Sequence, residues 1–277
     1  MKYEDKISKS IELLRNAERL ALKMQPDKGF FVAFSGGKDS QVLLRLVQLA
    51  GVKYHAVYSV VTLDRAENIR FLRKCYSEVE FSAKNTSILR LIEKKGLPTR
   101  AHRWCCERFK EVDGAGFVVL TGIRAEESRK RAKYTEVMKR GKAKKDSENL
   151  DLAEMEANEF RCVGGKDKIM VYPILEWSEA EVWRFLREQN LPINPCYEKD
   201  KRVGCSLCPF ASRKQNESFL AAHPRFKKVL LAAIGKYLQK SEGSSKLDSA
   251  EEVLDWWLSG DSINDYMSKK RQLKMDF

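Results

Sequence analysis

A glycine turn between an apolar run and a helical pattern limits most strongly what this chain can fold into. Residues 29–34 read GFFVAF, a short run rich in β-forming residues, and the segment SGGKDS at 35–40 follows at once. The next residues, QVLLRLVQLAG, repeat apolar side chains at helical spacing and end at Gly51, a favoured residue just past a helix. This order predicts a strand, a tight turn and a helix.

The same alternation continues along the chain. Apolar and β-rich runs predict strands at 54–61, 117–123 and 170–174, and helical spacing predicts helices at 66–76, 86–95 and 178–190. Ser178 and Glu181 have the spacing of a capping box at the start of the last of these helices. Strands that alternate with helices predict an α/β fold with a mainly parallel twisted sheet flanked by helices.

Three parts are expected. Residues 1–28 form an amphipathic N-terminal helix closed by Pro26, residues 29–210 form the α/β domain, and residues 211–277 form a helical C-terminal extension. In the extension, Ser249 is expected to cap a helix that carries the pair Trp256-Trp257. We expect these tryptophans to pack against the domain, with a partner-binding patch as the alternative.

A charged segment at about 132–168 is expected to be an insertion. Between Arg124 and Lys145 there are ten Lys or Arg and three Glu, while residues 146–159 carry six acids and no base. Segregated charge of this kind favours a solvated surface segment. The alternative is a lid that folds over an anionic ligand.

Composition excludes several classes of protein. With 277 residues, of which 43% are hydrophobic, the chain can bury a sizeable core and is not disordered throughout. Charged residues interrupt each apolar stretch long before the roughly 18 residues that a membrane span needs, and the N-terminus lacks the pattern of a secretory signal. We therefore expect a cytoplasmic protein without membrane contact. The formal charge of +13 favours a polyanionic partner.

The glycine turn is expected to bind phosphate. Its glycines allow positive φ and let backbone N–H groups converge on an anion at the start of a helix, where the helix dipole adds positive charge. A side-chain carboxylate beside phosphate suggests an intervening Mg²⁺ ion. The residues expected to hold the phosphates are Ser35, Gly36, Gly37, Lys38, Asp39 and Ser40.

Four of the seven cysteines arrive as two pairs. Cys105 and Cys106 are adjacent, and Cys205 and Cys208 form a Cys-x-x-Cys pair. Four thiolates satisfy either a [4Fe–4S] cluster or a structural zinc ion, and an adjacent pair is atypical of zinc ribbons. We expect a [4Fe–4S] cluster and keep zinc as the alternative. Cys75 is expected in the core, and Cys162 and Cys196 stand alone.

Together these motifs resemble the phosphoadenosine phosphosulfate (PAPS) reductase family of the adenine nucleotide alpha-hydrolase superfamily. The similarity includes SGGKDS, the two cysteine pairs, TGIRAEESRKR at 121–131, YPILEWSEAEVW at 172–183 and LPINPCY at 191–197. It is closest to iron–sulfur members such as the ATP pyrophosphatase of DNA phosphorothioation. The family's phosphate- or sulfate-binding segment maps onto Gly122, Arg124, Ser128 and Arg131. Arg124 also follows a predicted strand, where parallel sheets bind ligands.

The resemblance implies an enzyme that cleaves ATP between the α and β phosphates and transfers sulfur, with Lys38, Asp39 and Arg124 as its catalytic residues. ATP, Mg²⁺ and a [4Fe–4S] cluster would be its ligands. A nucleic acid, DNA or tRNA, would be the acceptor, and a cysteine desulfurase or another protein would donate the sulfur. A homodimer is one assembly that we consider.

Two alternatives remain open. Reductases of this family use a cysteine near the C-terminus, whereas the last cysteine here is Cys208, and their loops commonly replace the lysine that stands here at Lys38. An adenylyl sulfate or PAPS reductase would therefore need a thiol from a partner. The other alternative is a non-catalytic nucleotide- or nucleic-acid-binding module with structural zinc.

Overall fold

The computed structural model describes residues 1–140, 147–149, 168–240 and 246–275, and it divides the chain into two compact units. The first unit comprises Met1–Val60, Ala66–Ser82 and Glu111–Val203. The second comprises Val61–Arg65, Ala83–Lys110 and Gly204–Phe277.

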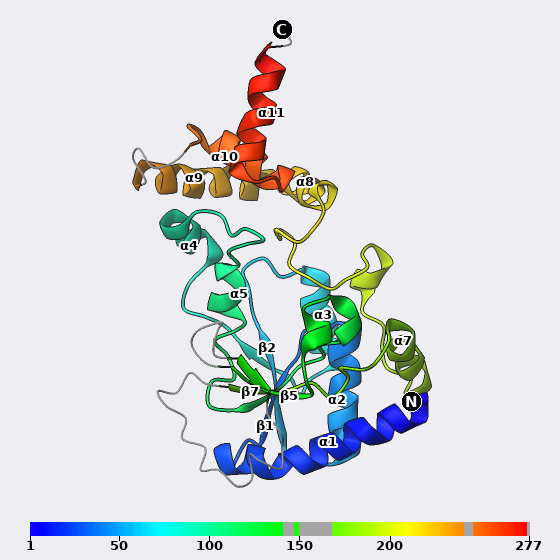
Figure 1. The fold of residues 1–277 in the computed structure, drawn as a ribbon. Coiled ribbons are helices and arrows are strands. Elements are labelled where there is room, and N and C mark those ends of the chain that lie inside the picture. The colour runs from blue at the N-terminus through cyan, green and yellow to red at the C-terminus, as the bar shows by residue number, and fades with distance from the viewer. Residues whose placement is uncertain (141–146, 150–167, 241–245, 276–277) are drawn as a thin grey trace. The chain divides into compact units, whose positions relative to one another are not determined.

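The first unit contains a seven-stranded sheet in the order β3-β2-β1-β4-β7-β5-β6 (Figure 1). The strands from β3 to β7 in this order run parallel, whereas β5 pairs antiparallel with β7 and β6. Their bounds are β1 Phe30–Ala33, β2 Tyr54–Ser59, β3 Glu80–Ser82, β4 Val118–Leu120, β5 Val137–Arg140, β6 Ser147–Asn149 and β7 Lys168–Val171. The predicted α/β fold with a mainly parallel sheet is confirmed.

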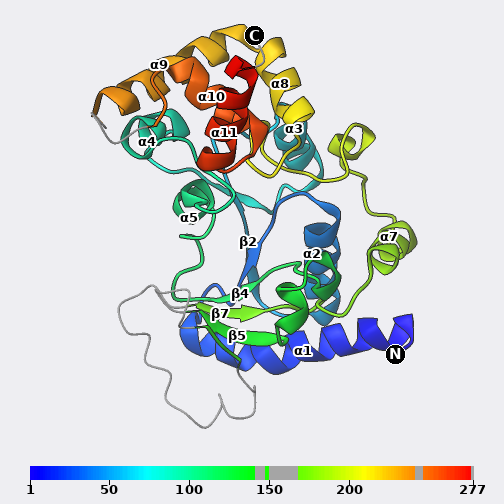
Figure 2. The ribbon, with the colours of Figure 1, turned by 45° about the horizontal axis from the view of Figure 1, so that its top comes forward.

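Alternating side chains of β1 enter different cores. Phe30 and Val32 belong to the larger core, to which the helices of this unit contribute, while Phe31 lies in a smaller cluster with Val57 and Val119. This period of two is the one expected for a strand that is buried on both faces. The helical segments of the unit are α1 Tyr3–Met24, α2 Lys38–Ala50, α3 Ala66–Cys75, α7 Glu179–Glu188, η1 Ala125–Glu127, η2 Arg131–Lys133 and η3 Pro195–Glu198. Figure 2 shows α1 and α2 beside the sheet.

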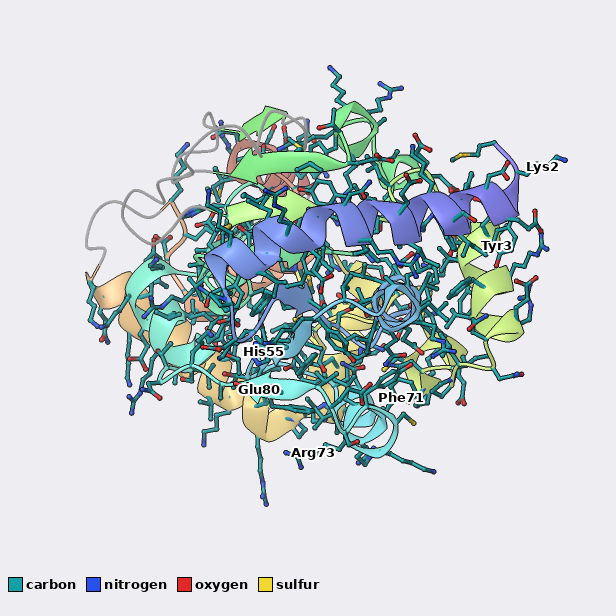
Figure 3. The ribbon with its side chains drawn as sticks, turned by 90° about the horizontal axis from the view of Figure 1, so that it is seen from below. Lys2, Tyr3, His55, Phe71, Arg73 and Glu80 are labelled. Atoms are coloured by element: carbon teal, nitrogen blue, oxygen red, sulfur yellow. The ribbon has the colours of Figure 1, made fainter. Side chains whose placement is uncertain are left out.

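Local signals in the sequence account for several element ends. Gly51 ends α2 with φ of 71°, and Ser178 and Glu181 form the predicted capping box of α7. At the sheet edge, His55 Nε2 lies 2.6 Å from the Glu80 carboxylate and joins β2 to β3 (Figure 3). The strand predicted at 170–174 instead spans Lys168–Val171, because Pro173 has no N–H group for a ladder and the chain turns there.

Two other sequence expectations change. Residues 137–140 of the expected insertion form β5 and extend the sheet, while 141–146 and 150–167, with Cys162, lie outside the described residues. Cys75 was expected in the core, but it is exposed at the last residue of α3, past the apolar face that Phe71 and Leu72 bury.

The second unit is helical and has its own core. Its helices are α4 Ile88–Lys95, α5 Trp104–Phe109, α8 Arg213–Ala222, α9 Pro224–Lys240, α10 Ala250–Ser259 and α11 Ile263–Met275. Ile92, Trp104, Leu230 and Trp257 are among its buried residues. The C-terminal helices therefore share one core with α4 and α5. The expected packing of the tryptophan pair is confirmed for Trp257, whose indole N–H donates to the Pro98 carbonyl at 2.5 Å.

No helix in the described part of the chain is both long and apolar enough to cross a membrane.

Candidate functional site

The glycine turn joins β1 to the first residue of α2, as predicted. Gly36 has φ of +77°, and a Cβ atom there would lie 2.7 Å from Asn68 Oδ1 and 2.8 Å from Leu72 Cδ2. A side chain at this position would therefore be strained and would also displace its neighbours. Gly37 caps α2, so the free N–H groups of the first helical turn begin here.

The two serines of the turn bind the turn itself. Ser40 Oγ accepts from the backbone N–H of Ser35 at 3.2 Å and donates to the Gly37 carbonyl at 2.8 Å. Ser35 Oγ accepts from the Gly37 N–H at 3.3 Å and lies 3.1 Å from Ser40 Oγ. Both hydroxyls thus stabilise the loop conformation.

Buried side-chain amides donate hydrogen bonds to the backbone carbonyls of the loop. Asn194, with no exposed surface, donates to the Gly36 carbonyl at 2.9 Å and to Asn68 Oδ1 at 2.7 Å. Asn68 donates in turn to the Ser35 carbonyl at 3.2 Å, and Gln41 donates to the Gly36 carbonyl at 3.1 Å. Because side chains of the protein bind these carbonyls, the protein itself holds the conformation of the loop.

The charged groups of the site pair with one another. Arg124 is 4% exposed, and its Nε donates to Asp39 Oδ1 at 2.7 Å. The Lys38 ammonium lies 3.2 Å from Asp39 Oδ2 and 3.4 Å from the Glu179 carboxylate, and Lys38 is 6% exposed. Two cations thus flank one carboxylate at the N-terminus of α2. The protein itself balances the charge of Asp39, for which the sequence suggested Mg²⁺.

Gly122 lets the segment after β4 approach α2. A Cβ atom at Gly122 would lie 2.8 Å from the backbone carbonyl of Asp39, so this contact requires glycine. Further along, Arg124 N donates to the Glu127 carboxylate at 3.1 Å, the Arg131 guanidinium pairs with the same carboxylate, and Ser128 Oγ accepts from Arg131 N at 3.2 Å. The structure therefore joins the predicted residues Arg124, Ser128 and Arg131 into one arrangement with Glu127.

Sequence reasoning did not assign a role to Asn68, Gln41, Glu179, Asn194 or Tyr197. The last two lie in LPINPCY, a segment that the resemblance pointed out, so a signal existed for them. Tyr197 accepts a hydrogen bond from the Lys38 backbone N–H at 2.8 Å. Burial raises the pKa of Tyr197 to about 12, so this phenol is neutral at physiological pH.

The four paired cysteines all lie in the second unit, and their thiols influence one another. A hydrogen bond with Cys106, then burial, raises the pKa of Cys105, and the charge of Cys205 adds to this effect. Burial raises the pKa of Cys205; the charges of Cys208 and Cys106 act in the same direction, and that of Lys110 opposes them. Lys110 Nζ lies 3.6 Å from Cys205 Sγ. Thiols from α5 and from 205–208 therefore lie close enough to affect one another's ionisation.

Two observations bear on what these thiols hold. Within the described ranges, no group of three or more His, Cys, Asp or Glu side chains is arranged to hold a metal ion. Trp104, directly before Cys105, is 1% exposed, and its indole N–H has no hydrogen-bond partner among the described residues. A buried N–H without an acceptor is costly, so a sulfur-rich group bound nearby would satisfy it.

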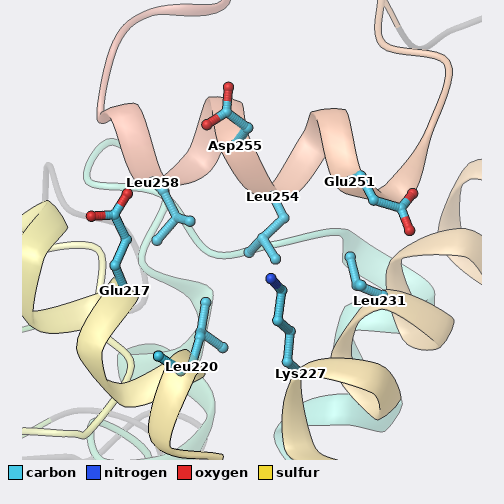
Figure 4. Close-up of a pocket in the computed structure, with 9 residues that line it drawn as sticks. Glu217, Leu220, Lys227, Leu231, Glu251, Leu254, Asp255 and Leu258 are labelled. Carbon is cyan, nitrogen blue, oxygen red and sulfur yellow. The ribbon is translucent and has the colours of Figure 1, made fainter. Parts of the chain in front are cut away.

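A pocket of about 290 Å³ lies elsewhere in the second unit, between α8, α9 and α10 (Figure 4). Leu220, Leu231, Leu254 and Leu258 line it, together with Lys227 and three carboxylates from Glu217, Glu251 and Asp255. Apolar walls and an excess of carboxylates do not suit a polyphosphate. The loop, rather than this pocket, is the candidate nucleotide site.

Comparison with known proteins identifies related sequences and folds. An uncharacterised protein of Methanocaldococcus jannaschii is 24% identical over 76% of this chain and 51% of its own length. Adenosine 5′-phosphosulfate reductase of Allochromatium vinosum is 30% identical over 39% of this chain and 36% of its own. The chain spans about half or less of the length of the first curated relatives that it matches.

A solved structure, the U34-tRNA thiolase NcsA from Methanococcus maripaludis with its [4Fe–4S] cluster, has a TM-score of 0.43 and 13% identity over 90% of this chain and 87% of that chain. The model of the phosphoadenosine phosphosulfate reductase domain matches residues 29–211, which hold the loop, the arginine segment and all four paired cysteines. The chain belongs to the phosphoadenosine phosphosulfate reductase family.

Proposed function

We propose that this protein is an ATP-dependent sulfur transferase that cleaves ATP between its α and β phosphates. The observation that carries the proposal is the pair of buried cations, Lys38 and Arg124, on either side of Asp39 at the start of α2. Buried cations beside free helix N–H groups form an environment for a polyanion.

Binding of ATP would exchange partners at the loop. Among the described residues the Glu179 carboxylate contacts only Lys38, and its side chain is 55% exposed, so it can turn to solvent when phosphate reaches Lys38. Arg124 is held more firmly, because Asp39 and Glu126 both accept from its guanidinium. Lys38 is therefore the cation that we expect to contact the β and γ phosphates, with Arg124 fixing the position of Asp39.

In the proposed reaction, an oxygen of the acceptor attacks the α-phosphorus of ATP and the bond to the β-phosphate oxygen breaks. Pyrophosphate leaves with the negative charge, which Lys38 and the loop N–H groups stabilise. The outer sulfur of a persulfide donor then attacks the acceptor atom that carries the activated oxygen, and AMP leaves with that oxygen. This leaves a disulfide between donor and acceptor, which a second thiol of the donor protein reduces to release the thiolated product and a donor disulfide. A cysteine desulfurase is one source of such sulfur.

Mg²⁺ would enter with the triphosphate and would use Asp39 as its protein ligand. Both Asp39 oxygens already accept from cations, yet each retains a second lone pair. The ion would supply additional positive charge at the β and γ phosphates.

Cys105, Cys106, Cys205 and Cys208 would hold a [4Fe–4S] cluster. The adjacent pair Cys105-Cys106 is atypical of zinc ribbons, which favours a cluster over a zinc ion at these four thiols. The positive irons would also offset the charge that raises the thiol pKa values. Bound there, the cluster would supply a fixed, sulfur-rich centre that orders this region.

The acceptor that we favour is a nucleic acid, DNA or tRNA. The net charge of +13 attracts polyanions, and such binding would weaken steeply as salt is raised. The proposal is tested by anaerobic incubation of the iron-loaded protein with Mg²⁺, α-labelled ATP and tRNA or DNA. AMP and pyrophosphate are the expected products. ADP and phosphate, or no α–β cleavage with any nucleic acid, would contradict it.

A second candidate function is reduction of adenylyl sulfate or PAPS, favoured by the similarity to the Allochromatium vinosum enzyme. The same loop would then bind the phosphates of a sulfonucleotide, and a partner would supply the reducing thiol. Release of sulfite from either sulfonucleotide in the presence of thioredoxin would support this function over sulfur transfer.

A further inference from the structure

The Tyr197 hydroxyl lies against the part of the loop where phosphate is expected to bind. Its hydroxyl accepts from the backbone N–H of Lys38 at 2.8 Å, and a Cβ atom on Gly37 would be 3.3 Å from the same oxygen. The Lys38 N–H is at the first position of α2, where backbone N–H groups have no acceptor within the helix. The phenol therefore stands over the part of the loop to which anions bind.

The phenol is held firmly in this place. The Tyr197 ring packs edge-to-face on Trp183 with 5.1 Å between centroids, and the Tyr197 backbone N–H donates to the Asn194 carbonyl at 3.0 Å. Asn194 itself is bound to the Gly36 carbonyl. Removing the phenol from the loop would break these contacts, so we expect it to stay when ligand binds.

The hydroxyl has one hydrogen left to donate. A phenol carries two lone pairs and one O–H, and the Lys38 N–H occupies a lone pair. Among the described residues no acceptor takes the Tyr197 hydrogen. Because the group is neutral, the O–H is available to an oxygen that arrives at the loop.

We infer that Tyr197 is a phosphate-binding residue of the loop, whose hydroxyl accepts from the Lys38 N–H and donates to the pyrophosphate moiety of ATP. The inference rests on the proposed function, since it assumes that polyphosphate binds at this loop. It adds a side-chain ligand from η3 to those of the loop itself, and it explains why η3 is tied to the loop by both Asn194 and Tyr197.

The test is calorimetric binding of inorganic pyrophosphate and of a non-hydrolysable ATP analogue to the wild type and to Tyr197→Phe. The variant keeps the ring that packs on Trp183 and loses only the hydroxyl. Loss of a hydrogen bond to a charged oxygen should weaken binding of both ligands about tenfold or more. Unchanged affinity would overturn the inference. Tighter binding would also overturn it, because it would mean that the phenol competes with phosphate for the Lys38 N–H.

Tyr3→Phe is the matched control. The Tyr3 hydroxyl donates to Glu188 at 2.8 Å from the start of α1, in the same unit (Figure 3), so this variant loses a phenol hydrogen bond without touching the loop. It should bind pyrophosphate as the wild type does. If the wild type binds neither ligand, the proposed function itself fails, whereas binding that Tyr197→Phe leaves unchanged removes only the inference.

Incorporation of difluorotyrosine at position 197 keeps the hydroxyl and makes a test possible even if the phenylalanine variant folds poorly. The fluorinated phenol ionises at lower pH than tyrosine. Pyrophosphate affinity should then fall as pH rises through this ionisation, since a phenolate cannot donate and repels phosphate. An affinity with the pH profile of the wild type would contradict the inference.

Discussion

The loop at 35–40 and the cysteine region differ in how far the protein itself provides partners for their buried polar groups. In the loop, side chains of the protein bind the buried polar groups: Asn194 and Asn68 hold the carbonyls, and Arg124 and Lys38 balance Asp39. In the cysteine region, burial and mutual contact raise the pKa values of Cys105 and Cys205, and the Trp104 N–H has no partner among the described residues. The buried polar groups of the loop thus have partners within the protein, whereas the Trp104 N–H of the cysteine region has none among the described residues.

This difference means that the two regions should respond differently to loss of a ligand. A preformed loop loses affinity when one of its groups is removed but keeps its fold. A site that lacks partners for its buried groups gains folding free energy from the bound group, so its stability and its occupancy are coupled. Four variants test the two halves of this comparison.

The largest effect is expected from Cys205→Ser. We expect the wild type, purified without oxygen, to contain about four irons per chain and to be coloured. The variant should lose the colour and nearly all of the iron, because serine is a poor ligand for the cluster. Iron analysis and the visible absorption spectrum measure this. Cys75→Ser, at an exposed thiol on α3, should keep its iron. One zinc per wild-type chain without colour would instead favour a structural zinc site.

Lys38→Met should impair the reaction without unfolding the protein. Removing one group that stabilises the leaving pyrophosphate costs about 10²–10³-fold in turnover. Asp39 keeps its partner Arg124 in this variant, so the melting temperature should change little. Initial rates of AMP formation give the effect, and Lys28→Met, at an exposed lysine before β1, is the control. A rate within a factor of two of the wild type would exclude Lys38 from the site.

Asn194→Asp tests how far the loop depends on its own support. The carboxylate keeps the acceptor for the Cys196 N–H but removes the donors to the Gly36 carbonyl and to Asn68. Asn68 Oδ1 would lose its donor and the Gly36 carbonyl would keep only that of Gln41, while a carboxylate would stand in a buried place, so the free energy of unfolding in urea titrations should fall by about 2–3 kcal/mol. Asn190→Asp, at an exposed residue with φ of 49°, should change it by less than about 0.5 kcal/mol. Equal stability of the two variants would show that the loop does not need this support.

The sequence could predict the parts of the site that follow from neighbours along the chain. The strand, the glycine turn and the helix could be predicted because the spacing of apolar residues changes from that of a strand to that of a helix within a few residues. Lys38 and Asp39 could be picked out by their place in the turn. The capping box of α7 is similarly local. The two cysteine pairs could be grouped because a metal site of this kind needs four thiolate ligands. Their spacing did not predict that both pairs belong to the second unit.

The parts that escaped prediction depend on distant contacts. Asn68 and Asn194 are 126 positions apart, and an asparagine in a helix carries no signal that it will hold a loop carbonyl. Residues 137–140, two of them basic, looked like a solvated insertion, yet they pair with β7 because backbone hydrogen bonds do not depend on side-chain charge. Likewise, the apolar face of α4 predicted burial but did not predict that α9 would cover it.

The smallest effect concerns Glu181, which fixes the first turn of α7, the helix that carries Glu179 and Trp183. Its carboxylate accepts from Lys6 Nζ at 2.8 Å and from the Ser178 backbone N–H at 2.7 Å. Burial acts to raise the pKa of Glu181, but the hydrogen bonds from Lys6 and Ser178 outweigh it and the pKa is lowered below the ordinary value near 4.5. The folded protein therefore holds this proton less tightly than the unfolded chain does.

Glu181→Gln keeps the capping geometry and removes the charge. Because the folded pKa is lowered, the stabilisation by Glu181 is fully present above about pH 5 and disappears as pH falls through the folded pKa. The variant should be less stable than the wild type by up to about 1 kcal/mol at pH 7, and the two unfolding curves should converge in acid. Glu12→Gln, at an exposed position on α1, should follow the wild type at each pH. If the variant stayed less stable than the wild type in acid, Glu181 would act through packing rather than through its charge. Charge pairs would then contribute less to the stability of this unit than the contacts of Glu181 suggest.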